Sequence, residues 1–302
     1  MSKYILVAGA INMDLVLKVK RLPLKGESIV GETIQFIPGG KGSNQAIAAS
    51  RLGTSAAFIG KVGKDSYGTQ LEDFLKSENL DLSGLGESND PTGLALITVD
   101  VAGDNTIVCI PGASTNVTRY FIKKHIKLIK DANVIVSNFE IPLEAVDELF
   151  TIAKNSNNTT ILNPSPALKA PFTLFQKVDY LILNETELSS MIGSKKILKK
   201  IDDITAAANF LRSHGPNVVV VTLGAKGAVT ITNNDRIRTE GIIVKAVDTT
   251  AAGDCFIGAF ATQINNGNKL SESLDFANKV AALSVQNAGA SSSLPRLKDI
   301  KF

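Results

Sequence analysis

The sequence predicts an α/β fold of the doubly wound class, with a mainly parallel sheet and a small antiparallel β lid. Two observations support the parallel sheet: short β-branched runs alternate with helical periods almost from end to end, and two long helical segments close the chain. A third observation supports the lid, because two segments break this alternation. We expect residues 1–302 to form one such domain, with a discontinuous lid at about residues 13–36 and 92–111.

The strands and helices of the main sheet follow one another along the chain. The predicted strands are residues 5–9, 56–62, 134–136, 180–183 and 218–221. The predicted helices are residues 43–52, 184–191, 203–214, about 254–266 and 270–287. Two further helices are predicted: one from the helical spacing of Tyr67, Leu71, Phe74 and Leu75, and one that has Pro142 at its start. Since strands and helices alternate, helices are expected to cover both faces of the sheet.

The predicted lid consists of the segments that break this alternation. Residues 14–20 place Leu15, Leu17 and Val19 on one side, which is the period of a half-exposed strand. Residues 92–99 and 106–110 flank Gly-Asp-Asn, which indicates a hairpin. An exposed, half-apolar sheet needs a cover, and a second copy of the chain is one way to supply it. We therefore expect a lid over a pocket or a surface for a partner.

The composition excludes several classes of function. The 302 residues carry 32 basic and 29 acidic side chains, and a net charge of +3 gives no electrostatic reason to expect nucleic-acid binding. No apolar run approaches the roughly 18 residues of a membrane-spanning helix. The 2 cysteines and 2 histidines lie far apart and supply neither a disulfide framework nor a zinc site. These features favour a cytoplasmic protein whose chemistry is not centred on histidine.

Residues 247–255, Val-Asp-Thr-Thr-Ala-Ala-Gly-Asp-Cys, lead into an apolar helix and carry the strongest chemical signal. Ala251, Ala252 and Gly253 leave backbone N–H groups uncovered at a helix start, where the helix dipole also favours an anion. Asp254 follows directly and can receive a proton from an attacking hydroxyl. Such a turn can stabilise a transferring phosphoryl group, and an ordinary helix N-terminus with a dipole-favoured Asp is the alternative.

Residues 38–45, Pro-Gly-Gly-Lys-Gly-Ser-Asn-Gln, open the first Ala-rich helix. Three glycines in four positions let a ligand approach the backbone closely, and Lys41 and Asn44 add polar groups suited to hydroxyls. The stretch is not a Walker A loop, because Gly42 stands where Ser or Thr is required. A flexible turn with a helix cap is the alternative interpretation.

Polar side chains also follow several predicted strands, at the sheet edge where parallel sheets bind their ligands. Asn12 and Asp14 follow the first strand and point the same way along an extended chain, which suits the capture of sugar hydroxyls. Glu140 follows a later strand. Residues 222–227 form a glycine turn that can pass under a nucleotide, and residues 184–187, Asn-Glu-Thr-Glu, can hold Mg²⁺ through water. A polar strand end or a plain helix cap is the alternative in each case.

Taken together and in this order, these stretches make the chain resemble the ribokinase-like family of carbohydrate kinases along essentially its whole length. The matching stretches are residues 9–14, 39–45, 140–144, 163–167, 184–187, 222–227 and 247–254. The resemblance implies a kinase that uses ATP, Mg²⁺ and K⁺ to phosphorylate the 5-hydroxyl of D-ribose, and a homodimer joined through the lids. Cys255 stands where the family often has Thr, which changes helix packing more than chemistry.

The resemblance also implies a role for each matching residue. Asp254 would be the general base, next to an anion hole formed by Ala251, Ala252 and Gly253. The sugar would be held by Asn12, Asp14, Gly40, Lys41, Gly42, Asn44, Glu140 and Asp254. ATP would contact Asn184, Thr222, Leu223, Gly224, Ala225, Lys226, Gly227, Gly253 and Asn278. K⁺ would be bound by Asp248, Thr250, Ser284, Asn287, Gly289 and Ser293, several of them through backbone carbonyls, while Glu187 would help to place Mg²⁺.

Other functions remain open at this point. A related kinase acting on deoxyribose, fructose or a nucleoside is the first alternative. A sugar- or nucleotide-binding protein without catalysis is the second, and the intact pair of Gly253 and Asp254 argues against it. A dinucleotide-dependent oxidoreductase is disfavoured, because residues 9–12, Gly-Ala-Ile-Asn, lack the Gly-x-Gly-x-x-Gly spacing that brings a pyrophosphate to a helix start.

Overall fold

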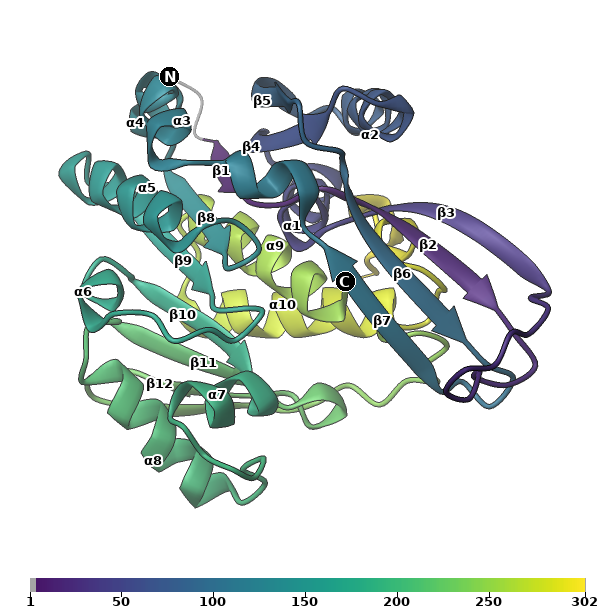
Figure 1. The fold of residues 1–302 in the computed structure, drawn as a ribbon. Coiled ribbons are helices and arrows are strands. Elements are labelled where there is room, and N and C mark those ends of the chain that lie inside the picture. Colours follow the sequence, from purple (N-terminus) through teal and green to yellow (C-terminus); the bar gives the residue numbers. More distant parts are fainter. Residues whose placement is uncertain (1–3, 302) are drawn as a thin grey trace.

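A nine-stranded sheet forms the centre of the structure, a computed structural model that describes residues 4–301 (Figure 1). Its strand order is β13-β12-β11-β10-β9-β8-β1-β4-β5. All pairs from β5 to β11 are parallel, and β12 and β13 are added antiparallel at one edge. The strands are β1 (Ile5–Ala8), β4 (Ala56–Gly63), β5 (Asp81–Ser88), β8 (Val134–Asn138), β9 (Thr159–Asn163), β10 (Tyr180–Asn184), β11 (Val218–Thr222), β12 (Ala228–Ile231) and β13 (Arg236–Thr239).

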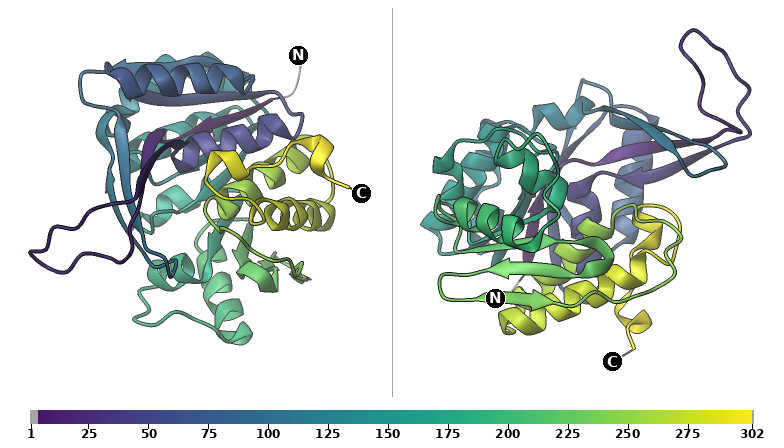
Figure 2. Two further views of the ribbon diagram at one scale, coloured as in Figure 1. Left: turned by 90° about the vertical axis from the view of Figure 1, so that its right-hand side faces the viewer. Right: turned by 90° about the horizontal axis from the view of Figure 1, so that it is seen from below.

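Helices cover both faces of this sheet, as the alternating sequence pattern predicts (Figure 2). One face packs against α1 (Lys41–Arg51), α2 (Ser66–Ser77), α9 (Ala252–Asn265) and α10 (Leu270–Ser284). The other packs against α3 (Arg119–Lys124), α4 (Ile126–Asp131), α5 (Leu143–Asn155), α6 (Phe172–Phe175), α7 (Glu185–Met191) and α8 (Ile201–Arg212). In β1 the side chains alternate between these two cores, because successive residues of a strand point to opposite faces. The predicted doubly wound fold is confirmed.

Four further strands form a second, smaller sheet that projects from the edge of the main one (Figures 1 and 2). They are β2 (Asn12–Lys18), β3 (Thr33–Gly39), β6 (Gly93–Val99) and β7 (Asn105–Ile110), in the order β3-β2-β6-β7. The two outer pairs are antiparallel, whereas β2 and β6 run parallel. We call these four strands the lid. It carries six exposed large apolar side chains: Ile34, Phe36, Leu96, Ile107, Val108 and Ile110.

Helices α1 and α9 cross at close range beneath the sheet. The contact is made at Gly258, where an added Cβ would lie 2.5 Å from the Cβ of Ala48 and 2.7 Å from the carbonyl oxygen of Gln45. No side chain larger than hydrogen fits at that distance. The glycine therefore sets how near the two helices come, and both helices begin at the carboxyl edge of the sheet.

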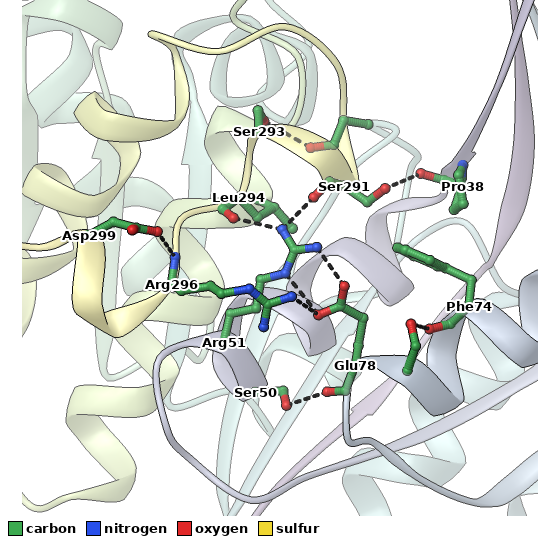
Figure 3. Close-up of polar contacts among 12 residues, drawn as sticks. Pro38, Ser50, Arg51, Phe74, Glu78, Ser291, Ser293, Leu294, Arg296 and Asp299 are labelled. Atoms are coloured by element: carbon green, nitrogen blue, oxygen red, sulfur yellow. Dashed lines mark hydrogen bonds and ion pairs between the residues drawn. The ribbon is translucent and has the colours of Figure 1, made fainter.

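A buried ion pair fastens the C-terminal segment to α1 and α2 (Figure 3). The guanidinium of Arg51 donates to both carboxylate oxygens of Glu78, at 2.9 and 2.6 Å, and these side chains are only 9% and 5% exposed. The same guanidinium donates to the carbonyl oxygens of Ser291 and Leu294, both at 2.7 Å. We call this arrangement the Arg51 clamp. Arg296 adds a longer contact to Glu78 at 3.4 Å.

Within the described residues, no helix has the length and apolar character needed to cross a membrane.

Candidate active site

The predicted general base lies in a cavity at the carboxyl edge of the main sheet. Asp254 is in the first turn of α9 and is 5% exposed. The cavity has a volume of about 180 Å³ and is lined by Lys41, Asn163, Ile182, Leu183, Asn184, Glu187, Thr222, Thr249, Ala251, Ala252, Gly253, Asp254 and Ile257. The structure thus brings together three stretches that are far apart in the sequence: the glycine turn before α1, the end of β10 and the start of α9.

The turn before α9 has the backbone geometry of an anion-binding site. Ala251 adopts a left-handed conformation, with φ of 58°, which is uncommon for a residue with a Cβ. Next to it, a Cβ added to Gly253 would meet nothing within 4 Å, so the backbone there faces open space. The N–H groups of a first helical turn lack intrahelical partners. The N–H of Ala252 donates to the carbonyl oxygen of Thr249 at 3.2 Å. Gly253 is the exposed residue of the three, whereas Ala251 and Ala252 are half-buried.

Glycines bring the turn before α1, which carries residues predicted to hold the sugar, close to the end of β1. Gly40 has φ of 95°, and a Cβ there would lie 2.8 Å from the carbonyl oxygen of Ala10. A Cβ on Gly42 would lie 2.6 Å from the Cα of Gly9. Larger residues would force α1 away from the strand. The close approach places the side chain of Asn44 3.3 Å from the carboxylate of Asp254.

Three buried carboxyl groups and one lysine face one another at this point. Burial, and after it the charge of Asp254, raises the pKa of Asp14 to about 7. Burial likewise raises the pKa of Glu140 to about 7, although the charge of Lys41 opposes that change. The pKa of Lys41 is itself raised, chiefly by Asp254. The backbone N–H of Lys41 donates to Glu140 at 2.7 Å. The group places six carboxyl oxygens near one ammonium group, so it offers several acceptors for hydroxyl donors.

Two buried oxygens at the same place have no partner in the protein. They are the side-chain oxygens of Asn12 and Asn44, whose residues are 9% and 4% exposed. A buried acceptor without a donor is destabilising by about 1–3 kcal/mol. Donors from a polyhydroxylated ligand would satisfy both, which fits the sugar-binding role that the resemblance implies.

We expect Asp14→Asn to stabilise the unliganded protein at alkaline pH. A carboxyl group whose folded-state pKa is raised favours folding at low pH, and that contribution is lost as the pH rises from about 4 to about 7. The amide removes this loss, so urea unfolding should show a gain on the order of 1 to 3 kcal/mol at pH 8 that shrinks toward pH 5. The exposed change Asp73→Asn is the control. Equal effects of Asp14→Asn at both pH values would contradict the burial of a charged group.

A second cavity, of about 240 Å³, lies on the other side of the α9 turn. It is lined by Thr222, Gly224, Ala225, Gly227, Ile242, Ile243, Val244, Ala246, Thr249, Ala252, Gly253, Phe256, Asn278, Ala281, Ala282 and Val285. Thr222, Thr249, Ala252 and Gly253 line both cavities, so the two are adjacent. An apolar slot beside an anion-binding turn suits a nucleotide base.

The predicted nucleotide residues divide between this cavity and other places. Thr222, Gly224, Ala225 and Gly227 line it, together with Asn278, whose side-chain amide donates to the carbonyl oxygen of Glu240 at 2.8 Å. Leu223, 6% exposed, packs instead into the core on the far face. Lys226 is exposed and does not line the cavity. The apolar wall formed by Ile242, Ile243, Val244 and Ala246 was not identified from the sequence.

The residues predicted for K⁺ lie around Asp248. One oxygen of its carboxylate accepts from the N–H and hydroxyl of Thr250, at 2.8 and 2.6 Å, and the other accepts from the N–H of Gly289 at 2.8 Å. These hydrogen bonds lower its pKa although burial acts to raise it. The hydroxyls of Ser284 and Ser293 donate to carbonyl oxygens within their own turns, and Asn287 is exposed.

The pair predicted near Mg²⁺ forms a helix cap. The side chain of Asn184 accepts from the N–H of Glu187 at 2.8 Å, and the carboxylate of Glu187 accepts from the N–H of Asn184 at 2.9 Å. This capping box accounts for the sequence pattern, yet both residues also line the cavity of Asp254. Between residues 4 and 301, no group of three or more His, Cys, Asp or Glu side chains is placed to hold a metal ion.

Two features of the site were not predicted from the sequence. Gln45 donates from its amide to the carboxylate of Asp254 at 2.9 Å, and Asn138 donates to Gln45 at 3.4 Å. A glutamine within an Ala-rich, buried helix was the signal that could have revealed the first. Burial raises the pKa of Cys109, and so do the charges of Glu140 and Asp14, so β7 of the lid lies near two of the residues predicted to hold the sugar.

Comparisons with known proteins agree with this architecture. Residues 2–297 match the pfkB family of carbohydrate kinases. The chain is 37% identical to the ribokinase of Schizosaccharomyces pombe over 98% of its own length and 96% of the relative's, and 36% identical to the ribokinase of Staphylococcus aureus over 99% of both. The structure of Arabidopsis thaliana ribokinase with ribose and ATP is 30% identical, with a TM-score of 0.92 over 99% of this chain and 97% of that one. The chain therefore belongs to the pfkB family of carbohydrate kinases.

Proposed function

We propose that the protein transfers the γ-phosphoryl group of ATP to the 5-hydroxyl of D-ribose and releases ribose 5-phosphate and ADP. The observation that carries this proposal is the position of Asp254. Its carboxylate lines the cavity that contains the anion-binding turn, and it also contacts Asn44 of the glycine loop at 3.3 Å. One carboxylate is therefore shared by a place suited to a phosphoryl group and a place suited to a sugar.

In this proposal the side chains position the reactants and stabilise charge. Asp254 accepts the proton of the 5-hydroxyl as that oxygen attacks the γ-phosphorus, and burial raises its pKa, which makes the carboxylate a better proton acceptor. The anion hole of Ala251, Ala252 and Gly253 stabilises the charge of the transferring group, mainly through Gly253. The sugar is held by Asn12, Asp14, Gly40, Lys41, Gly42, Asn44 and Glu140.

ATP is proposed to span the two adjacent cavities. The base would occupy the apolar slot between residues 222–227 and Asn278, and the phosphates would lie toward Asn184 and Gly253. Mg²⁺, when bound, neutralises charge on the phosphate oxygens. Glu187 is the carboxylate of this chain placed to help hold it, and the absence of a metal-binding cluster among residues 4–301 fits an ion that is held chiefly by phosphates and water.

A K⁺ site at Asp248 is also part of the proposal. The side chains there fit a hard monovalent cation, because their ligating atoms are oxygens only: the carboxylate of Asp248, whose pKa hydrogen bonds lower against the effect of burial, and the hydroxyl of Thr250. Backbone carbonyls would complete the set, as the family resemblance implies. The segment from Asp248 leads directly into the turn of Ala251. A bound cation would hold this segment, and with it the turn of Ala251, in one conformation.

We further propose that two chains dimerise through their lids. Val108 of β7 is 59% exposed, and the strand register places it on the same face of the lid as the exposed Ile34, Phe36, Leu96 and Ile110. Ile107, 54% exposed, lies on the opposite face. An apolar, unpaired sheet of this kind is covered in most proteins. A wild-type protein that sediments as a monomer at micromolar concentration would refute this, and Val108→Lys should shift a dimer toward monomer.

The identity of the sugar substrate is tested by measuring ADP release with ribose, deoxyribose, fructose and adenosine. We expect ribose to give the highest kcat/KM, because each polar group left unpaired by a missing hydroxyl costs about 1–3 kcal/mol. Replacing K⁺ by Li⁺ at constant ionic strength should lower the rate. A higher kcat/KM for another acceptor would select one of the alternative kinases, and sugar binding without ADP release would indicate a binding protein.

A further inference from the structure

A layer of three uncharged amide side chains, those of Gln45, Asn138 and Asn163, lies next to Asp254, and of the three only Asn163 lines the cavity. Gln45 and Asn138 are both 0% exposed, and Asn163 is 6% exposed. They come from α1 and from the carboxyl ends of β8 and β9. Burying an amide is unfavourable unless its donors and acceptors are paired. Their presence in an otherwise apolar region therefore needs a physical reason.

Gln45 links this layer to the carboxylate of Asp254. Asn163 accepts a long hydrogen bond from the Gln45 amide, at 3.5 Å, and donates to the carbonyl oxygen of Ile182 at 3.0 Å. The amide nitrogen of Gln45 donates to Asp254 Oδ1 at 2.9 Å, and the amide oxygen of Gln45 accepts from Asn138 at 3.4 Å. The side-chain oxygen of Asn138 accepts from the backbone N–H of Glu140 at 3.1 Å. A charged carboxylate only accepts hydrogen bonds, so the orientation of the Gln45 amide is fixed and that of Asn138 follows from it.

The two oxygens of Asp254 consequently have different surroundings. Oδ1 is held by Gln45, whereas Oδ2 is left to a long contact with Asn44, at 3.3 Å, and to the cavity. We propose that Gln45 is a positioning residue, whose amide holds one oxygen of Asp254 so that the other faces the sugar hydroxyl. This inference rests on the proposed role of Asp254 as general base. Asn138 supports it by holding the Gln45 amide in place.

The charged groups that face Asp254 set the background for a test by titration. Lys41 of α1 lowers its pKa, and Glu187 of α7 raises it. Asp14 of β2 and Glu140 also interact with it through their charges. Burial raises the pKa of Asp254, and the hydrogen bonds from Gln45 and Asn44 act in the opposite direction. Removing the Gln45 donor should therefore move the titration of Asp254 to higher pH.

Gln45→Met removes the amide and keeps the length of the side chain. We expect the side-chain carboxyl of Asp254, followed by ¹³C NMR in aspartate-labelled protein, to titrate roughly one to two pH units higher than in the wild type. Its resonance is assigned with Asp254→Asn, and that of Asp14 with Asp14→Asn. The acid limb of kcat/KM should move by the same amount, and kcat should fall roughly tenfold, because a misplaced base reacts more slowly.

Thr160→Val is the matched control, since it removes a 0% exposed polar group from the opposite end of β9. We expect it to lower stability and leave the titration of Asp254 unchanged. If Gln45→Met does not fold, Asn138→Ala frees the Gln45 amide and should give a smaller shift in the same direction. An unshifted Asp254 in the folded variant overturns the inference, even if kcat falls. An inactive wild type refutes the proposed function alone, because the NMR titration needs no turnover.

Discussion

Asp254→Asn will abolish most of the sugar-dependent ADP release, with kcat lower by about 10²- to 10⁴-fold. The reason is that the carboxylate alone can take the proton of the sugar hydroxyl, and an amide of nearly the same shape cannot. Ribose binding should persist, because the other proposed sugar contacts, among them Asn12 and Asn44, are unchanged and an amide has nearly the same shape as the carboxylate that lines the cavity. Steady-state kinetics measure the first effect, and calorimetric titration with ribose measures the second.

The same variant is also expected to fold well. Burial raises the pKa of Asp254, so the charged form opposes folding near neutral pH and a neutral amide removes that penalty. A melting temperature at or above that of the wild type would exclude unfolding as the cause of lost activity. The exposed substitution Asp202→Asn serves as the activity control. Near-normal kcat in Asp254→Asn would refute the assignment of the base.

Arg51→Met will lower the free energy of unfolding by about 3–5 kcal/mol, measured by urea denaturation. The substitution leaves Glu78 as a buried charge without its main partner, and it removes the donors to Ser291 and Leu294 (Figure 3). The pKa of Glu78 is lowered in the folded protein, through its hydrogen bonds and charge contacts with Arg51 and Arg296. Its charged state is therefore part of the native structure.

The double variant Arg51→Met with Glu78→Leu separates the effect of the unpaired charge of Glu78 from the effect of the lost hydrogen bonds to Ser291 and Leu294. Removing both charges should recover much of the lost stability, because an apolar pair can replace a buried ion pair at little net cost. Lys76→Met breaks only exposed pairs with Glu72 and Asp73 and should change stability by less than about 1 kcal/mol. A loss of that small size in Arg51→Met would show that the Arg51 clamp contributes little to stability.

The main architecture could be predicted from the sequence because the spacing of apolar residues shows which side chains are buried. This spacing identified β1, β4, β8, β10 and β11, whose apolar runs are buried on both faces. It did not identify β5, β9, β12 and β13. These are short, polar or interrupted by glycine, as in Arg-Ile-Arg-Thr of β13, so their pairing depends on neighbours that are distant in sequence. The end of α10 at Ser284 and the start of α9 at Ala252 also differ from the expected bounds by two or three residues.

Part of the candidate site could also be predicted from the sequence, namely the residues that stand in recognisable local patterns. Asp254, Asn44 and Lys41 stand in stretches whose local pattern is informative by itself. The contact of Gln45 with Asp254 joins residues 209 positions apart, and the contact of Arg51 with Ser291 joins residues 240 positions apart. Such contacts depend on how the helices pack, and the local sequence pattern does not show how they pack. Leu223 and Lys226 show the converse, since they lie within a matching motif and yet outside the cavity.

The close crossing at Gly258 has a consequence for chemistry as well as for packing. In the proposed reaction α1 holds the alcohol and α9 the phosphate, so the spacing between the two helix axes would set the gap that the transferred group must bridge. An alanine at position 258 would push the helices apart and move the phosphate donor away from the acceptor, without altering any residue proposed to touch either. On this proposal, phosphate transfer depends on a hydrogen atom in a helix interface, outside the reaction centre.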